Sequence, residues 1–425
     1  MSVTTQLRAS GTGSRTARAR TWVADRGVIL TALGVIAVRL VTTIATTGGQ
    51  VTSAFERSYW TIDWSQGFIR RGLTGTVLEP IPVLRERAGI TAVVLAMTVV
   101  CLAVWLTVMW QAVARGGRPT AAVAIVALAS PAGLLFLITQ KRPDQLGLIV
   151  LCVYGAVVLR RPAARIETIA SVVAGLALGI TALVHEAIPL LFLPFLFIVR
   201  TIRERDDPSI VRGDAIGRRL ALAGPSLVAI AVIVLRGPVT AAQSSALLDA
   251  ATGAGVVDPI GTTAFDNAGM YQYLSDGPGD ISRRFAESIG VRGVAGFVVL
   301  AGIVAALMAG ALWSMRDPST RPAGLDLARF RRWIAPLDVG VLVGAYAALF
   351  VTAIDWWRWS CWLALGGLTT FQLSRLARTG TASVVRRRLH PTVGFAVGVI
   401  GLLWLRPLTA VPPGLDAAAH LLLGR

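Results

Sequence analysis

The sequence predicts an all-α integral membrane protein whose chain crosses the bilayer many times. Hydrophobic residues make up 54% of the 425 residues, and charged residues make up only 15%. A water-soluble domain carries about 25% charged residues, so this chain has too little polar surface to cover a soluble globule. Its apolar runs reach about 18–20 residues, long enough for a helix to cross roughly 30 Å of hydrocarbon. Because a backbone in lipid must satisfy its own hydrogen bonds, each run is expected to be a helix.

About eleven apolar segments are long enough to be spanning helices. The fourth is short, and the fifth and sixth form one apolar stretch that is broken only at His185 and Glu186. No internal repeat is visible that would favour a transporter built from inverted halves. The predicted segments are residues 27–45, 89–113, 120–138, 145–159, 167–184, 187–202, 219–236, 292–313, 336–353, 359–374 and 391–407.

These segments divide the chain into three parts. Residues 1–26 are rich in serine, threonine and arginine and are predicted to form a disordered cytoplasmic N-terminus. Residues 27–407 form the transmembrane domain, with long outer loops at 46–88 and 237–291, and residues 408–425 form a C-terminal tail. Since no small-residue cleavage pattern follows the first apolar run, we interpret that run as a retained helix and not as a signal peptide.

The distribution of basic residues predicts the orientation of the chain. The formal net charge is +18, but the charges lie in short clusters between apolar runs and form no single basic patch. That pattern is typical of membrane loops and argues against a nucleic-acid partner. The clusters at 15–20, 115–118, 160–161, 200–219, 329–332 and 386–388 share one side if the N-terminus is cytoplasmic, as the positive-inside rule requires. We therefore expect a multi-pass protein of the inner (plasma) membrane with its N-terminus in the cytoplasm.

The first outer loop contains the most informative motif. Asp63 lies seven residues before the paired Arg70 and Arg71, with glycines on both sides of the arginines. A carboxylate near a membrane surface can act as a general base toward a hydroxyl, and arginine forks bind phosphate through two parallel hydrogen bonds. An interfacial amphipathic helix, with aromatic side chains in lipid and arginines at the headgroups, would have a similar sequence.

A second polar motif lies at a turn between two predicted helices. Lys141 is the only lysine of the chain, and Arg142 and Asp144 follow it closely. The two cations could hold a phosphate that Asp144 positions. The same residues also suit a purely structural role, because Pro143 favours the first helical position and Asp144 in the first turn favours the helix dipole.

Two further polar motifs fall at the outer ends of predicted helices. His185 and Glu186 interrupt an apolar stretch, and ionisable residues at membrane depth usually face a partner or a wet cavity. Histidine is also the side chain that transfers protons near neutral pH. Asp355 and Arg358 stand three apart at the start of the tenth helix, where they would share one face and could pair or bind a ligand. The tryptophans beside them are also typical of an interfacial anchoring belt.

No cofactor is predicted. The three cysteines fall inside apolar runs, and the sequence contains no Cys/His spacing typical of a metal site. A His-Glu-x-x-His motif would need its second histidine at position 189, which is Pro189. The residue pattern leaves the use of a divalent metal open.

Together these features resemble the GT-C superfamily of membrane glycosyltransferases. Members of that superfamily use polyprenyl-phosphate-linked sugars and place a catalytic acid in or near a long first outer loop. The resemblance rests on residues 63–75, 142–144, 185–186 and 355–359, and in topology it covers most of the chain. It extends to uncharacterised bacterial membrane proteins grouped near that superfamily. This sequence departs from the pattern of the superfamily, because two closely spaced acidic residues do not directly follow its first predicted helix.

The resemblance implies an enzyme that transfers a sugar from a lipid-linked donor to a glycan or lipid acceptor on the extracytoplasmic side. Asp63 is the residue that it assigns as base, and His185 and Glu186 complete the candidate catalytic set. Two other functions fit the sequence, namely a transporter or flippase of lipid-linked saccharides and a non-catalytic membrane scaffold. The candidate substrate-binding residues are Arg70, Arg71, Lys141, Arg142, Asp144, Asp355 and Arg358.

Overall fold

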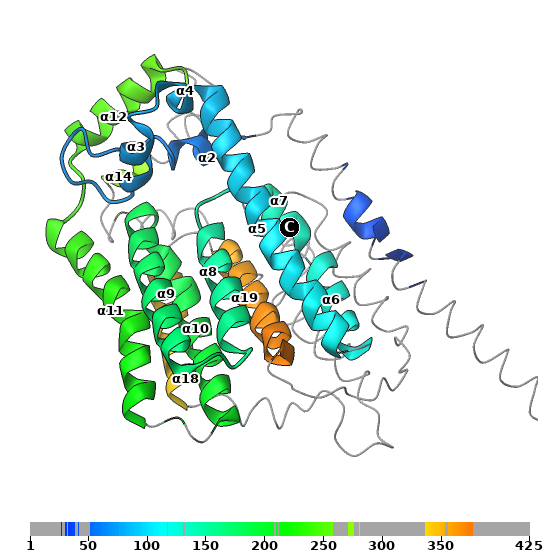
Figure 1. The fold of residues 1–425 in the computed structure, drawn as a ribbon. Coiled ribbons are helices and arrows are strands. Elements are labelled where there is room, and N and C mark those ends of the chain that lie inside the picture. The colour runs from blue at the N-terminus through cyan, green and yellow to red at the C-terminus, as the bar shows by residue number, and fades with distance from the viewer. Residues whose placement is uncertain are drawn as a thin grey trace, which may run out of the picture.

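Every element of the computed structural model is a helix within the residues that it describes. These residues are 52–257, apart from 117, 131, 208, 209 and 211, together with parts of 27–41, 271–275, residue 280, 336–352 and 356–376. The long helices form a bundle, and shorter helices from the two outer loops lie together above one end of it (Figure 1). The predicted all-α class is therefore confirmed for the described part of the chain.

The long helices lie where the sequence predicts spanning segments. They are α5 (Arg87–Gly116), α8 (Gln145–Val158), α9 (Ala164–Val184), α10 (Ala187–Asp206), α11 (Arg212–Arg236), α18 (Pro336–Thr352) and α19 (Trp356–Leu376). Three described stretches, Arg87–Ala114, Ala164–Val184 and Gly213–Arg236, are long and apolar enough to cross a membrane, and two apolar helices are shorter. The predicted number of eleven is not confirmed, and the segments at 292–313 and 391–407 lie outside the described residues.

The predicted segment at 120–138 is two helices, α6 (Arg118–Ala129) and α7 (Leu134–Thr139). Gly133 precedes α7 with non-helical backbone angles, φ −97° and ψ −138°. A Cβ atom at this position would lie 1.9 Å from the carbonyl oxygen of Ala127, so the break requires a residue without a side chain. The interruption brings the turn at residues 140–144 to the end of the bundle that lies under the outer loops.

Helices α9 and α11 pack closely because small residues line their contact. A Cβ added to Gly175 would lie 2.0 Å from the carbonyl oxygen of Ala221, and one added to Gly179 would lie 2.8 Å from Pro225. Glycines four residues apart on one helix allow two backbones to approach, which is how helices commonly associate in lipid. The exposed faces of both helices carry leucine, isoleucine and valine, as a lipid-facing surface requires.

The two outer loops fold together into a helical cap. The first loop supplies α2 (Ala54–Ser58), α3 (Leu73–Leu78) and α4 (Pro82–Arg85), and the second supplies α12 (Ala241–Gly253) and α14 (Tyr271–Leu274). Figure 1 shows these helices side by side above the bundle. Their buried apolar residues form one core with the start of α5, which includes Tyr59, Ile62, Ile69, Leu247 and Tyr271. The cap thus joins loops that are far apart in the sequence.

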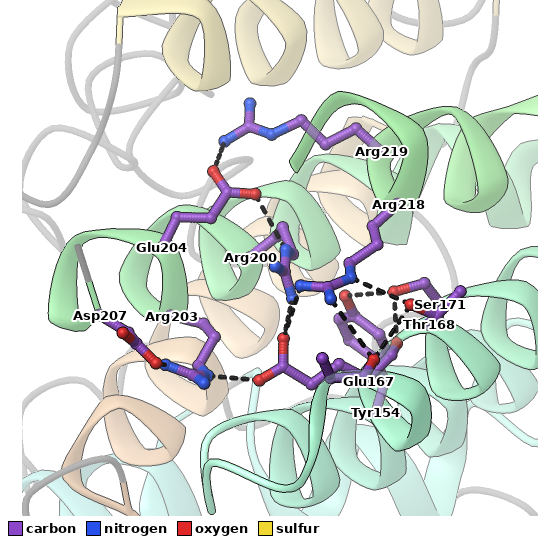
Figure 2. A network of polar contacts seen from close by, with 11 residues as sticks. Tyr154, Glu167, Thr168, Ser171, Arg200, Arg203, Glu204, Asp207, Arg218 and Arg219 are labelled. Atoms are coloured by element: carbon purple, nitrogen blue, oxygen red, sulfur yellow. Dashed lines mark hydrogen bonds and ion pairs between the residues drawn. The ribbon is translucent and has the colours of Figure 1, made fainter. Parts of the chain in front are cut away.

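A buried ionic network joins α9, α10, α11 and α18 at the opposite end of the bundle (Figure 2). Glu167 is its centre: the carboxylate accepts hydrogen bonds from Arg200 at 2.7 Å, Arg203 at 2.6 Å and Arg218 at 3.0 Å. Glu167 is 1% exposed. From the sequence, these arginines are expected to be loop charges, and their common partner is not predicted. The network also contains Glu204, Asp207, Arg219 and Asp338.

Candidate active site

The polar motifs of the sequence meet at the end of the bundle that the cap covers. Four chain segments supply them: the first outer loop, the turn before α8, the break between α9 and α10, and the start of α19. The break has a local cause, because His185 has extended backbone angles (φ −159°, ψ 112°) and cannot continue α9. The common location of these motifs agrees with the predicted arrangement of the helices. Which end of the bundle faces the cytoplasm remains a prediction.

Asp144 and His185 form the buried centre of this site. Nδ1 of His185 lies 2.7 Å from Oδ1 of Asp144, and the two residues are 2% and 0% exposed. Asp144 stands at the N-cap of α8, but its side chain makes no capping hydrogen bond and turns to the histidine instead. An aspartate that accepts the Nδ1 proton fixes the tautomer and orientation of the ring, and it leaves Nε2 as a proton acceptor.

Arg71 and Glu186 form a second pair at the same site. Nε of Arg71 donates to Oε2 of Glu186 at 2.8 Å, and its Nη2 donates to Oε1, so the contact has two parallel hydrogen bonds. Nη1 of Arg70 lies 3.9 Å from the same carboxylate. Arg71 has a positive φ of 70°, which is uncommon for a residue with a long side chain. Strained backbone of this kind persists only where the surroundings impose it, and it often marks functional sites.

Aromatic rings enclose the histidine on two sides. The ring of Tyr59 meets His185 edge-on at 5.4 Å, and the ring of Trp359 lies nearly parallel to it at 6.3 Å. The guanidinium of Arg358 lies 4.1 Å from the Trp359 ring centroid, with its Nε 3.7 Å from Oδ2 of Asp144. The buried indole N–H of Trp359 has no acceptor among the described residues. The site therefore combines a histidine–carboxylate pair, aromatic faces and several guanidinium groups.

The charges at this site suit an anionic ligand. Arg70, Arg71 and Arg358 contribute three guanidinium groups, whereas Asp144 and Glu186 contribute two carboxylates. Arg142 adds a further cation nearby, because its guanidinium lies 4.4 Å from the Phe55 ring and 5.9 Å from the Tyr59 ring. Guanidinium forks match the geometry of phosphate and carboxylate groups. Within the described residues, no three His, Cys, Asp or Glu side chains are arranged to hold a metal ion.

The remaining predicted residues have other partners or lie outside the described chain. Asp63 is 3% exposed, and its Oδ1 accepts hydrogen bonds from the backbone N–H of Ser65 at 3.0 Å and from the Ser65 hydroxyl at 2.5 Å. Its Oδ2 pairs with Arg85 at 3.0 Å. The backbone N–H of Lys141 donates to Glu56 at 3.3 Å. Asp355 lies outside the described residues.

Sequence reasoning missed Tyr59, which contributes to the site, and Arg85, which pairs with Asp63. Tyr59 begins the motif that contains Asp63, but an aromatic residue in such a loop is equally typical of a membrane anchor. Arg85 lies 22 residues after Asp63, beyond the reach of any local spacing rule. Because the chain contains many arginines, the one that pairs with Asp63 cannot be recognised from the sequence, and the edge-on contact of Tyr59 with His185 depends on the fold.

The contribution of the Arg71–Glu186 pair to stability should depend on pH. Burial by itself would raise the pKa of Glu186, but the neighbouring cations, Arg71 first among them, together hold this pKa well below its ordinary value of 4.5. A lowered folded-state pKa stabilises the protein above about pH 4.5, and this contribution is lost as the pH falls below that value. We therefore expect Glu186→Gln to lower the melting temperature between pH 5 and 8, and the difference from wild type to shrink below pH 4.5. A difference that stays constant down to pH 3 would contradict the assignment.

Comparisons with known proteins place the chain among membrane proteins without a known activity. A family model described as "Uncharacterised membrane protein Rv1490" matches residues 26–260. Two similar proteins are "Uncharacterized protein Rv1490" of Mycobacterium tuberculosis (strain ATCC 25618 / H37Rv) and "Uncharacterized protein Mb1527" of Mycobacterium bovis. Each is 28% identical over 136 residues, which cover 32% of this chain and 31% of the relative, so the match spans about a third of their length. No solved structure matches the chain.

Proposed function

This chain belongs to the family of the uncharacterised membrane protein Rv1490, and we propose that it is a glycosyltransferase-like enzyme of the membrane. In this proposal, the site beneath the cap transfers a sugar from a lipid-phosphate donor to a hydroxyl of a glycan or lipid acceptor on the extracytoplasmic side. The observation that carries the proposal is the Asp144–His185 pair, 2.7 Å apart and beside three guanidinium groups. A base next to an anion site is what such a transfer needs.

The proposed reaction uses both halves of the site. Nε2 of His185 takes the proton of the acceptor hydroxyl, and the oxygen then attacks the anomeric carbon of the donor sugar. The bond between that carbon and the phosphate oxygen breaks, and the phosphate leaves with the bonding electrons. Arg70, Arg71 and Arg358 stabilise the negative charge on the departing phosphate, a form of stabilisation that often dominates catalysis. The faces of Tyr59 and Trp359 offer apolar surfaces for the C–H groups of a sugar ring.

His185 is a better candidate for the base than Asp63. Both carboxylate oxygens of Asp63 already have partners, Ser65 and Arg85, whereas within the described residues Nε2 of His185 makes no hydrogen bond. The role of Asp63 as base remains a prediction of the sequence resemblance. In the present proposal Asp63 shapes the first loop, because it accepts from the backbone two residues ahead in the manner of an Asx turn.

Asp63→Asn separates these two roles. If His185 is the base, turnover of this variant should remain within about tenfold of wild type, because an amide still accepts the Ser65 hydrogen bonds. If Asp63 is the base, turnover should fall by about two to four orders of magnitude. The measurement is transfer of radiolabelled sugar by purified protein, with the melting temperature of each variant as a control for folding.

Transfer of a radiolabelled sugar from polyprenyl phosphate to an acceptor is also the direct test of the function. Purified full-length protein in a maltoside detergent should convert the labelled donor to a product that no longer carries the lipid, and His185→Asn should not. If a panel of polyprenyl-phosphate sugars is neither bound nor converted, the proposal is wrong. Release of the intact donor across a vesicle membrane, without cleavage, would indicate a flippase instead.

The geometry favours an enzyme over a transporter. A transporter of lipid-linked saccharides would need a polar path between the two ends of the bundle. The site under the cap and the Glu167 network are separated by apolar packing of α8, α10 and α19. That packing includes Leu148, Leu151, Phe192 and Trp362, all fully buried. In the described residues, the charged groups of the site and of the Glu167 network are therefore separated.

A further inference from the structure

Glu186 is an acid placed where the proposed donor would put its phosphate. Arg71 grips this carboxylate through two hydrogen bonds, and Arg70 approaches the same carboxylate at 3.9 Å. The reaction described above has no use for a second acid at this point, since His185 takes the proton. A negative charge among the groups that should stabilise a leaving phosphate would even oppose the reaction.

We propose that Glu186 is an internal competitor, which occupies the position of the donor phosphate in the empty site and leaves it when a phosphate monoester or diester binds. This inference rests on the proposed function, because it takes Arg70 and Arg71 as the donor's phosphate-binding residues. It goes beyond that function by giving Glu186 a role in regulating access to the arginines. Carboxylate and phosphate are interchangeable in such a role, because both accept two parallel hydrogen bonds from one guanidinium.

Arg70 and Arg71 are held in place, whereas a ligand could displace the carboxylate of Glu186. The side chains of Arg70 and Arg71 are 18% and 11% exposed, and that of Glu186 is 28% exposed. Arg70 is fixed by a hydrogen bond from Nη2 to the carbonyl of Leu274 at 3.1 Å. The turn beneath the arginines is packed tightly, because a Cβ added to Gly72 would lie 2.2 Å from the ring of Trp64. A ligand would therefore move the carboxylate and leave the guanidinium frame where it is.

The displaced carboxylate has a favourable place to go. Glu186 is the N-cap residue of α10, and its side chain makes no capping hydrogen bond. The N-terminus of a helix carries a partial positive charge that stabilises a nearby anion. Rotation of the side chain from Arg71 toward the start of α10 would thus replace one favourable interaction with another, which lowers the cost of opening the site.

Calorimetric titration of the full-length protein in dodecyl maltoside, a detergent without phosphate, tests the competition. The probes are farnesyl phosphate, inorganic phosphate and dihexanoyl phosphatidylglycerol. Glu186→Gln removes the competing charge but keeps the size of the side chain, so it should bind farnesyl phosphate about tenfold more tightly than wild type, equal to about 1.4 kcal/mol. Arg71→Ala should abolish binding. Glu79→Gln, which changes an exposed acid of the same loop, is the matched control and should bind like wild type.

The outcomes separate this inference from the proposed function. Equal or weaker binding by Glu186→Gln, with wild type binding the probe, would overturn the competition and leave the donor site standing. Absence of binding by wild type and Glu186→Gln alike would overturn both. If Glu186→Gln gains affinity for phosphatidylglycerol alone, Glu186 still competes with a phosphate. The arginines would then bind a membrane lipid and not the proposed donor. If Glu186→Gln does not fold, Glu186→Asp serves instead, because its shorter side chain is a weaker competitor and should show a smaller gain in affinity.

Discussion

His185→Asn is expected to lower the rate of sugar transfer by about two to four orders of magnitude, with little change in melting temperature. The introduced amide can still donate to Asp144, so the buried carboxylate keeps a partner. It cannot accept a proton as the imidazole Nε2 does. The loss should therefore be in turnover, and the affinity for farnesyl phosphate should stay close to that of wild type because the arginines are unchanged. Rates from purified protein with radiolabelled donor, together with titration calorimetry, measure the two effects separately.

Asp144→Asn is the companion to this variant. It keeps the shape of the side chain, but its amide can present N–H where the carboxylate accepted the Nδ1 proton, which favours the wrong tautomer of His185. Turnover should fall by about 100-fold or more. Ser65→Ala is the matched control, because it removes a hydrogen bond from the same cap without touching the histidine, and it should keep most of the activity. Full turnover in His185→Asn would remove His185 from the mechanism and return the role of base to Asp63.

Glu167→Gln is expected to have the largest effect on stability, at the other end of the molecule. The substitution leaves Arg200, Arg203 and Arg218 around a neutral amide in a buried environment. Removal of one partner from a buried ion pair typically costs about 3–5 kcal/mol, because the remaining charge is left uncompensated. The melting temperature and the yield of folded protein in detergent should both fall strongly, while binding of farnesyl phosphate per folded molecule should not change.

Glu204→Gln provides the comparison for that experiment. Glu204 pairs with Arg200 and Arg219, but its side chain is 17% exposed, against 1% for Glu167. Arg200 keeps Glu167 as a partner and Arg219 is partly exposed to water, so the melting temperature should fall much less. A second comparison is Glu167→Gln combined with Arg203→Gln, which should recover part of the lost stability because it removes one uncompensated charge. Equal stability of Glu167→Gln and Glu204→Gln would show that the network does not hold the helices together.

The class of fold and the break between α9 and α10 could be predicted because both depend on local patterns. Runs of apolar residues predict helices in lipid, and a His-Glu dipeptide in such a run predicts a break, as the structure has it between α9 and α10. The split of 120–138 was missed because Gly133 is compatible with a helix in isolation. Only the close approach of the Ala127 carbonyl makes glycine necessary there.

The partners of the charged residues could not be predicted, because they depend on distant parts of the chain. Asp144 and His185 are 41 residues apart, and Arg71 and Glu186 are 115 apart. Glu167 follows three helical residues of α9 and resembles an ordinary first-turn acid that favours the helix dipole. Nothing in its own segment indicates that three arginines from α10 and α11 converge on it. A count of loop charges assumes that such arginines are exposed to solvent. In the structure they are buried and pair with Glu167.

The composition of the cap has a consequence for the order of events during biosynthesis. The first loop contributes Tyr59, Ile62 and Ile69 to a core that includes residues of α5 and is completed by α12 and α14. Ile62 and Leu247 are separated by 185 residues, which a ribosome synthesises in roughly 10–40 s at about 5–20 residues per second. During that interval the apolar face of the first loop has α5 beside it but lacks the contacts from α12 and α14. Arg70, which donates to the carbonyl of Leu274, is therefore fixed only after the second loop has been synthesised, and completion of the proposed binding site is a late step of assembly.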